Sequence, residues 1–349
     1  MQEDNKAAQK KTSFFARNNF PESTESLCFG TALARFPSSM LIEPTSQGYC
    51  SYTLLNTSQQ LAIQFRPEKH AIDVEISELA REIHGSWAPV TKLLGCVSLS
   101  PRLDFYSHSL IPGKVLSNFP FENGGVNAAE LVHELAVFSS QAYHHPSSGA
   151  SRKLGRIGSG LEGRLLLLRE GLPVRFRGLV NCVLLRLEEI VGLPWVLTHG
   201  DFNPDNIIVK LDKSKRELKL KGVIDWAEAE FLPFGTGLYG LESILRYLGG
   251  SVPSDGPGVE VRVKLREIFW SELEKQIPKL KTDEEFRERV KLAGLMGVLF
   301  WYGIAFDNGA LDRVVENGRD DKEVRMLGDI LFEAGGWENY AGLVEDSKK

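Results

Sequence analysis

Short apolar runs alternate with polar turns between residues 40 and 110, a pattern typical of β-strands joined by tight connections. In the middle of this segment the apolar side chains instead recur at helical spacing. The expected elements are strands at 52–55, 61–66, 92–97 and 103–110 and a helix at 71–84. This part of the chain therefore predicts a mostly β domain with one helix.

After residue 110 the apolar positions follow the helical period over most of the chain. Asn127 followed by Glu130 is typical of the start of a helix. The expected helices span 131–142, 161–169, 174–190, 259–276, 284–306 and 321–332. Two short strands, 207–211 and 217–221, interrupt this pattern, and the polar residues between them predict a hairpin. A mainly helical second domain with one hairpin is expected.

These patterns divide the 349 residues into three parts. Residues 1–25 are polar and predict a flexible extension, residues 26–110 form the β-rich domain, and residues 111–349 form the helical domain. The net charge of -5 arises from interspersed acidic and basic residues, which argues against a nucleic-acid or membrane partner. The four scattered cysteines and the lack of a hydrophobic signal segment are typical of a cytoplasmic protein.

The residues that flank the hairpin carry the strongest chemical signal. His199–Asp201 (His-Gly-Asp) and Asn206 precede the first strand, and Asp225 lies just after the second strand. Asn206 and Asp225 are equally far from the centre of the turn, so antiparallel pairing in that register would place an amide oxygen beside a carboxylate. Such oxygen ligands suit Mg²⁺, which takes phosphate oxygens in its remaining positions. Asp201 would then hold an attacking hydroxyl.

This pair of motifs behind a small β domain resembles the aminoglycoside phosphotransferase family, which includes choline kinase relatives, and the chain looks like the fungal members of that family. The similarity is sharpest between residues 195 and 240. The resemblance implies an α+β, bilobal, protein-kinase-like fold with a small β-rich N-lobe containing one helix and a larger, mainly helical C-lobe. It also implies that the γ-phosphate of ATP, bound with Mg²⁺, is transferred to a hydroxyl of a small molecule.

The resemblance further assigns roles to residues of the C-lobe. Asp201 matches the catalytic aspartate that orients the acceptor hydroxyl, and Asn206 and Asp225 match the magnesium ligands. His199 matches the residue that supports the catalytic loop, and we interpret it as a structural donor, not as an acid or base. Asp307 ends an aromatic stripe that is most simply helix core, although it could meet an amine or hydroxyl of the acceptor.

In the N-lobe, the resemblance places Gly48 and Ser51 in the loop that covers the nucleotide phosphates. Ser109 and Ile111 match the two ends of the strap whose backbone meets adenine. Without the downstream motif, a short Gly-Ser loop of this kind would indicate only a turn between strands. The assignment of these four residues to a nucleotide site therefore depends on the resemblance.

The sequence departs from the family pattern at three places. Gln64 stands where the family has a lysine that binds phosphate, and Arg66, on the same side of the strand, could supply that cation. The acidic partner on the following helix is either Glu75 or Glu78. A downstream aspartate of the family is missing, because residues 232–235 contain no acid.

These departures motivate a second hypothesis, a catalytically impaired nucleotide-binding regulatory module that resembles a pseudokinase. A third hypothesis, phosphorylation of protein side chains, is disfavoured by Trp226 after Asp225 and by the absence of an Ala-Pro-Glu activation segment. The identity of the acceptor, the choice between ATP and GTP, and the oligomeric state remain open from the sequence.

Overall fold

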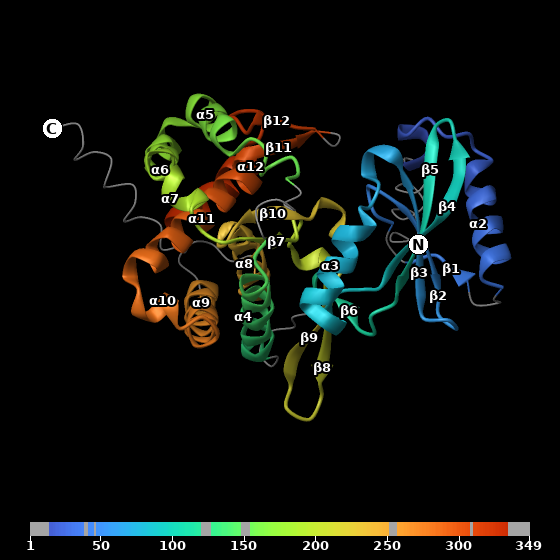
Figure 1. The fold of residues 1–349 in the computed structure, drawn as a ribbon, viewed down its shortest axis with the longest axis horizontal. Helices are drawn as coiled ribbons and strands as arrows, with labels where there is room; N and C mark the ends of the chain where they lie inside the picture. Colours follow the sequence, from blue (N-terminus) through green and yellow to red (C-terminus); the bar gives the residue numbers. More distant parts are fainter. Residues whose placement is uncertain are drawn as a thin grey trace. The chain divides into compact units, whose positions relative to one another are not determined.

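The computed structural model describes residues 14–37, 41–44, 47–119, 127–147, 154–250, 257–307 and 310–333. The chain folds into two compact units (Figure 1). The first contains residues 1–113 and 221–227, and the second contains residues 114–220 and 228–349. The short segment 221–227 therefore belongs to the N-terminal unit. The division expected from the sequence placed this segment in the helical domain, because that division used contiguous stretches only.

The first unit is built on an antiparallel five-stranded sheet in the order β1-β2-β3-β5-β4. Its strands are β1 (Leu41–Ile42), β2 (Tyr52–Asn56), β3 (Leu61–Pro67), β4 (Thr91–Leu99) and β5 (Arg102–Ser109). Its helices are α2 (Thr24–Arg35) and α3 (Val74–His84). The structure confirms the expected strands and the helix after Pro67.

The two faces of this sheet differ in character. Phe65 of β3 lies opposite Phe105 of β5, and their rings stack with centroids 4.9 Å apart. On the other face, Gln64 lies opposite Tyr106, and Arg66 lies opposite Asp104. Since successive residues of a strand alternate between faces, one face provides the apolar core and the other presents polar side chains.

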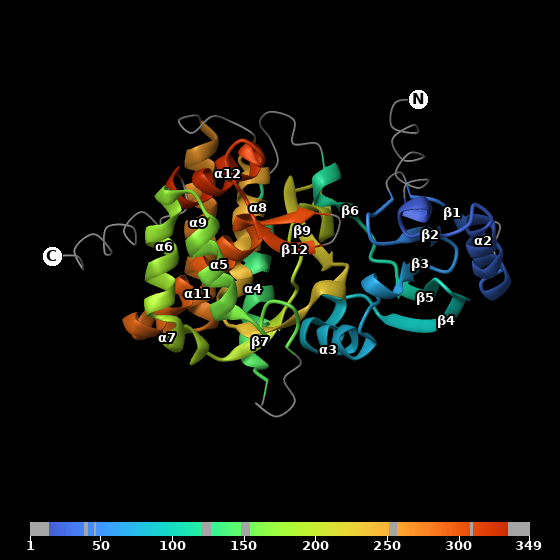
Figure 2. The same ribbon diagram turned by 90° about the horizontal axis from the view of Figure 1, so that it is seen from above.

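The apolar face is covered by the N-terminal segment. Phe14, Phe15 and Phe20 are buried together with Cys28 and Ala32 of α2, in one cluster with residues of the sheet. Helix α2 lies beside this sheet (Figure 2). Aromatic rings bury large areas, so three of them are enough to fix a segment whose other residues are polar. Residues 14–25 therefore do not form the flexible extension predicted from their composition, and residues 1–13 lie outside the described part of the chain.

The second unit is mainly helical. Its helices are α4 (Ala129–His144), α5 (Leu161–Gly171), α6 (Val174–Leu185), α7 (Leu187–Val191), α8 (Tyr239–Leu248), α9 (Pro257–Gln276), α10 (Lys279–Thr282), α11 (Glu284–Gly303) and α12 (Asp321–Gly328). Its short strands are β6 (Lys114–Val115), β7 (Trp195–Thr198), β8 (Ile207–Asp212), β10 (Glu230–Pro233), β11 (Ile304–Asp307) and β12 (Ala310–Val314), and β9 (Glu217–Val223) begins in it. Helices α4 and α9 pack side by side (Figure 1).

The predicted hairpin is present. Strands β8 and β9 are neighbours in a sheet of order β6-β8-β9. The turn between them is closed by Asp212, whose Oδ1 accepts hydrogen bonds from the backbone N–H of Ser214 and from its hydroxyl, at 3.0 and 2.6 Å. An aspartate that binds the backbone two residues later is a common turn device, and it fixes where the two strands reverse.

Three helix boundaries differ from the expectation. The helix expected over 174–190 is interrupted at Arg186, between α6 and α7. The helix expected over 284–306 ends at Gly303, and the next residues form β11, paired with β12. Helix α12 ends at Gly328 and gives way to a π-helical turn over Asp329–Glu333. An apolar run alone does not distinguish the end of a helix from a short buried strand, which explains the second error.

None of the described helices is both long and apolar enough to cross a membrane. The cytoplasmic location expected from the composition stays a prediction.

The N-terminal aromatic cluster gives a stability prediction. Replacing Phe14, which is 1% exposed, by alanine should lower the free energy of unfolding by about 3–5 kcal/mol, because the ring is lost and a cavity remains. Urea denaturation followed by circular dichroism measures this change. The control Phe29→Ala removes a ring that is 38% exposed on α2 and should cost about 1 kcal/mol or less. Equal effects of the two variants would contradict the packing of this segment.

Candidate functional site

The loop after β7 holds the carboxylate of Asp201 through two amide side chains. Asn203 Nδ2 donates to Oδ1 at 2.6 Å, and Asn206 Nδ2 donates to Oδ2 at 2.8 Å. Asn206 Nδ2 also donates to the Asp201 carbonyl oxygen at 2.8 Å. Because the amide nitrogen of Asn206 is engaged in this way, its oxygen is the atom that can coordinate a cation. The structure thus brings Asp201 and Asn206 together, and it adds Asn203, which the motif did not include.

The two residues before Asp201 shape the loop. Gly200 has a φ of +79°, and a Cβ on it would lie 1.9 Å from the backbone oxygen of Glu228. No other residue fits at this position. His199, which is 4% exposed, accepts the Asp201 N–H at its Nδ1, at 3.2 Å. A neutral imidazole that accepts at Nδ1 carries its proton on Nε2, so at this contact His199 supports the loop as an acceptor and not as the expected donor.

Two aromatic residues of the second unit clamp the backbone on both sides of Asp201. Trp301 Nε1 donates to the carbonyl oxygen of Gly200 at 2.6 Å, and Phe202 donates its backbone N–H to the hydroxyl of Tyr239 at 2.9 Å. The rings of Trp301 and Tyr239 stack with centroids 4.0 Å apart and planes 10° from parallel. Burial raises the pKa of Tyr239 well above its ordinary value, so the hydroxyl stays protonated.

This aromatic clamp was not predicted. The sequence indicated a loss of support for the loop, because residues 232–235 contain no acid, and the segment that contains Trp301 was interpreted as helix core. A signal was nevertheless present, because tryptophan and tyrosine have polar tips that usually find a hydrogen-bond partner when buried. The pairing of Trp301 on α11 with Tyr239 at the start of α8 depends on the tertiary fold.

The first unit contains a chain of hydrogen bonds on the polar face of its sheet. Ser51 Oγ lies 3.3 Å from Thr53 Oγ1, which accepts from Gln64 Nε2 at 3.4 Å. Arg66 Nε donates to Gln64 Oε1 at 3.0 Å, and Arg66 Nη2 donates to Asp225 Oδ1 at 2.6 Å. Four residues expected at a nucleotide site, Ser51, Gln64, Arg66 and Asp225, are thus connected in one network.

Arg66 is the centre of that network. Its side chain is 1% exposed, whereas the side chain of Asp225 is 33% exposed. Its Nη1 also donates to the carbonyl oxygen of His70 at 3.3 Å. A guanidinium has five N–H donors, and three are used here, so two have no acceptor among the described residues. Arg66 can therefore bind Asp225 and still offer hydrogen bonds to an anion.

The segment around Asp225 is fixed in an unusual conformation. Asp225 has a φ of +64°, in the left-handed region that side chains other than glycine seldom occupy. The ring of Trp226 contacts the ring of His84 of α3 in a tilted arrangement, with centroids 5.3 Å apart, and its Nε1 donates to the carbonyl oxygen of Val223 at 2.9 Å. Such local strain persists only where surrounding contacts impose it, and it is concentrated at functional sites.

Neither glutamate of α3 that was expected to pair with the cation of β3 forms an ion pair with Arg66 in the described part of the chain. Glu75 and Glu78 are both exposed. Among the described residues the acid paired with Arg66 is Asp225. The backbone of Glu75 has a different role, because its N–H donates to the side chain of Asp73, which caps α3. The prediction of an ion pair between Arg66 and either glutamate is therefore wrong.

The strap after β5 has one notable backbone group. Ser109 donates its N–H to Val90 at 2.9 Å, and Leu110 donates its N–H to Gln60 at 2.8 Å. Among the described residues, the N–H of Ile111 has no acceptor. The side chain of Ile111 packs against Gly222, where a Cβ would lie 2.4 Å from Ile111 Cδ1. Contact of Ser109 and Ile111 with a nucleobase stays a prediction, as does contact of Gly48 with phosphate.

Within the described ranges, no group of three or more His, Cys, Asp or Glu side chains is arranged to hold a metal ion. A Mg²⁺ ion held by one amide, one carboxylate and phosphate oxygens does not require such a group. Asn206 lies in the second unit and Asp225 in the first. Their joint binding of Mg²⁺ stays a prediction, and the oxygen chemistry of both side chains fits it.

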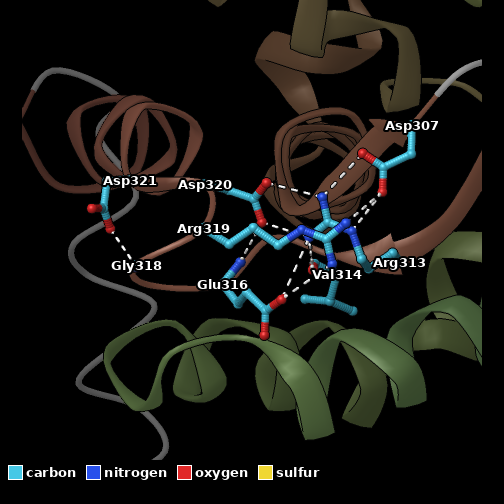
Figure 3. Close-up of polar contacts among 8 residues, drawn as sticks. All are labelled: Asp307, Arg313, Val314, Glu316, Gly318, Arg319, Asp320 and Asp321. Carbon is cyan, nitrogen blue, oxygen red and sulfur yellow. Dashed lines mark hydrogen bonds and ion pairs between the residues drawn. The ribbon is translucent and has the colours of Figure 1, made fainter.

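Asp307 is engaged in ion pairs (Figure 3). Its two oxygens accept from Arg313 Nε at 2.6 Å and from Arg313 Nη2 at 3.2 Å, and Arg319 lies 3.5 Å away. Hydrogen bonds from Arg313 lower the pKa of Asp307. Arg313 also binds Asp320 at the start of α12, so this group connects the β11–β12 hairpin to that helix. The structure thus gives Asp307 a structural partner, Arg313. Contact of Asp307 with the small molecule that would accept the phosphoryl group stays a prediction.

The aromatic clamp gives a prediction about local stability. Tyr239→Phe leaves the Phe202 N–H without its acceptor, which should raise hydrogen exchange in the loop about tenfold. Hydrogen-exchange mass spectrometry of peptides that cover residues 199–206 measures this effect. Trp301→Phe, which keeps a ring but loses the indole N–H, should act in the same direction. The control is Tyr143→Phe, since burial and not a hydrogen bond to a described residue raises the pKa of the Tyr143 hydroxyl. Unchanged exchange in both clamp variants would show that the clamp does not hold the loop.

Comparisons with known proteins find one family match and several solved structures that are similar to this chain. Residues 69–235 match the model of the phosphotransferase enzyme family. The chain is similar to a GDP complex of an aminoglycoside 2'-phosphotransferase, with 15% identity, a TM-score of 0.51, and coverage of 92% of this chain and 96% of that one. It is also similar to an aminoglycoside phosphotransferase from Streptomyces rimosus, with 12% identity, a TM-score of 0.46, and coverage of 79% and 98%.

A third similar structure is a spectinomycin phosphotransferase in complex with ADP and spectinomycin, with 15% identity, a TM-score of 0.46, and coverage of 87% and 92%. No curated protein matches the sequence. Nothing in these findings bears on a fungal affinity. The protein-kinase-like α+β fold and the resemblance to aminoglycoside phosphotransferases are confirmed, and the match to the phosphotransferase enzyme family extends over residues 69–235.

Proposed function

We propose that this protein transfers the γ-phosphoryl group of ATP to a hydroxyl group of a small organic molecule. The observation that carries the proposal is the fixed carboxylate of Asp201, whose two oxygens accept hydrogen bonds from Asn203 and Asn206. Phosphoryl transfer requires little covalent chemistry from the protein and depends on alignment and on neutralisation of charge. A carboxylate held on both oxygens, in a loop clamped on both sides, suits the task of alignment.

In the proposed reaction, Asp201 orients the hydroxyl of the acceptor toward the γ-phosphorus. The hydroxyl oxygen forms the new bond to phosphorus, the bond from phosphorus to the β–γ bridging oxygen breaks, and ADP leaves. The hydroxyl proton passes to the carboxylate of Asp201. His199 accepts the Asp201 N–H and so has a supporting role in this scheme.

The first unit supplies groups for the nucleotide. Arg66, with two N–H donors not used by described residues, would bind phosphate oxygens in place of the family lysine, and Gln64 orients the guanidinium. The loop that contains Gly48 and Ser51 would cover the phosphates. Asn206 and Asp225 would hold Mg²⁺, which when bound supplies neutralisation of the charge on the phosphate oxygens.

The acceptor is proposed only as a class. The solved structures similar to this chain include phosphotransferases named for aminoglycosides, spectinomycin and macrolides. Because the residues of a site and not the fold determine the substrate, these names do not transfer to this chain. We therefore expect a small molecule with an accessible hydroxyl, and the oligomeric state does not enter the proposal.

The decisive variant is Asp201→Ala. It should lower turnover about 10²–10⁴-fold, since proton transfer and alignment of the acceptor are lost, while the affinity for Mg-ATP stays within about twofold. Turnover is measured as Mg-dependent ATP consumption with a panel of hydroxylated metabolites, and affinity is measured by titration calorimetry. The matched control is Asp205→Ala, an exposed acid of the same loop, which should leave both quantities unchanged.

Three outcomes would overturn the proposal. Equal turnover in wild type and Asp201→Ala would remove the catalytic role of this residue. Stabilisation of the wild-type protein by Mg-ATP without turnover on any acceptor would favour the nucleotide-binding regulatory module. Labelled phosphate that appears on proteins of a lysate, and not on small molecules, would favour the protein-kinase hypothesis.

A further inference from the structure

One arginine of the second unit is buried without a partner. Arg262 of α9 is 5% exposed, and its Nε has no hydrogen-bond acceptor. Its guanidinium forms no hydrogen bond and no ion pair with any described residue. A buried charge is costly unless an opposite charge compensates it, as Asp225 does for Arg66. Arg262 therefore indicates an anion that the described part of the chain does not supply.

The charged side chains around Arg262 carry a surplus of positive charge. Glu242 of α8 accepts hydrogen bonds from Arg266 of α9 at 3.1 and 2.5 Å. Asp329 accepts a hydrogen bond from Arg246 of α8 at 3.0 Å. Among the described residues of this group, each acid thus has an arginine of its own, and Arg262 is left over. Burial and the charges of Arg246 and Arg266 lower the pKa of Arg262, but an arginine stays charged in proteins, so a bound anion would stabilise the cluster.

Helix α8 connects this cluster to the loop that contains Asp201. The first residue of α8, Tyr239, accepts a hydrogen bond from that loop at 2.9 Å. Residues three, four and seven positions later lie on the same side of a helix, and here they are Glu242, Ser243 and Arg246. A rise of about 1.5 Å per residue places Arg246 about 10 Å along the helix from Tyr239. One small molecule can span this distance.

Tyr302 of α11 lies between the loop and the cluster. Its hydroxyl is hydrogen-bonded with Ser243 of α8. Burial raises the pKa of Tyr302, and the charges of Glu242 and Asp201 add to this rise, whereas the charge of Arg246 opposes it. One hydroxyl group is thus influenced both by the carboxylate of Asp201 and by the charged cluster. The two groups are therefore neighbours within the second unit.

We propose that Arg262, together with Arg246, binds an anionic group of the acceptor, a carboxylate or a phosphate, while Asp201 orients the hydroxyl of the same molecule. The side chains of Arg246 and Asp329 are 30% and 26% exposed, so the cluster reaches the surface there. The planar guanidinium matches a carboxylate or a phosphate with two parallel hydrogen bonds. This inference rests on the proposed function and names its acceptor class as hydroxylated acids and phosphate esters.

The first test measures anion binding without catalysis. Sulfate is titrated into the full-length protein at constant ionic strength, with Mg-ADP present to occupy the proposed nucleotide site, and binding is followed by calorimetry. Arg262→Met should lower the affinity for sulfate about 10–100-fold, because charge-assisted hydrogen bonds are lost. Arg262→Lys, which keeps the charge without the planar fork, should lower it less. The matched control is Arg169→Met, whose side chain is 43% exposed on α5, and its affinity should stay within about twofold of wild type.

The second test identifies the acceptor class. Mg-dependent ATP consumption is measured with pairs of compounds that differ only in charge, each pair a hydroxy acid and its neutral amide. Wild type should have a lower KM for the acids than for the amides. Arg262→Met should raise KM for the acids about tenfold and change kcat by less than about twofold, because the residue binds a group remote from the reacting hydroxyl. KM for the amides should not change.

A structural control accompanies both tests. Arg262→Met removes a buried charge without a partner, so the variant should be at least as stable as wild type in urea denaturation. If it does not fold, Arg262→Lys is used in its place in the same comparisons. A variant that binds sulfate weakly and is as stable as wild type has lost a binding group and not its fold.

The outcomes separate this inference from the proposed function. Sulfate binding that is absent from wild type, or equal in wild type and Arg262→Met, overturns the anion site. Sulfate binding that depends on Arg262, in an enzyme that prefers the neutral amides, shows an adventitious ion only and overturns the acceptor class. Sulfate binding that depends on Arg262 without turnover on any acceptor supports the anion site and overturns the proposed function.

Discussion

A buried arginine requires a negative charge close by, and Asp225 supplies it to Arg66. The two residues are separated by 159 positions in the sequence and meet at 2.6 Å. Removing one partner of a buried pair costs about 3–5 kcal/mol, because the remaining charge is left without compensation. The pair therefore holds the segment 221–227 against the first sheet and explains why this short stretch belongs to the N-terminal unit.

The second unit organises its own chemistry by a different means. Around Asp201 the fixed groups are neutral: two amides, an imidazole nitrogen, an indole N–H and a phenol. In these contacts the carboxylate is held by the neutral amides of Asn203 and Asn206. The first unit thus pairs the Asp225 carboxylate with a cation, whereas the second orients the Asp201 carboxylate through amide groups.

The sequence predicted what depends on local pattern. The strands of the first sheet and the hairpin follow from alternation and turn residues. The hydrogen bond from Asn206 to Asp201 was not among the predictions, which placed Asn206 beside Asp225. The sequence did not predict contacts between distant segments. Three contacts depend on the tertiary arrangement: the packing of Phe14 on the sheet, the hydrogen bond from Trp301 to the loop, and the ion pair of Arg66 with Asp225. The presence of Gln64 in place of the family lysine did not indicate that Asp225 would pair with Arg66.

The position of residues 221–227 has a consequence for biosynthesis. While the chain is being made, the first 113 residues leave the ribosome long before Asp225 does, so the nascent N-terminal unit contains a guanidinium without its counter-charge. That unit becomes complete only after the loop that contains Asp201 has been synthesised. A truncation at the apparent boundary, residue 113, would separate a core from the carboxylate that its central cation requires.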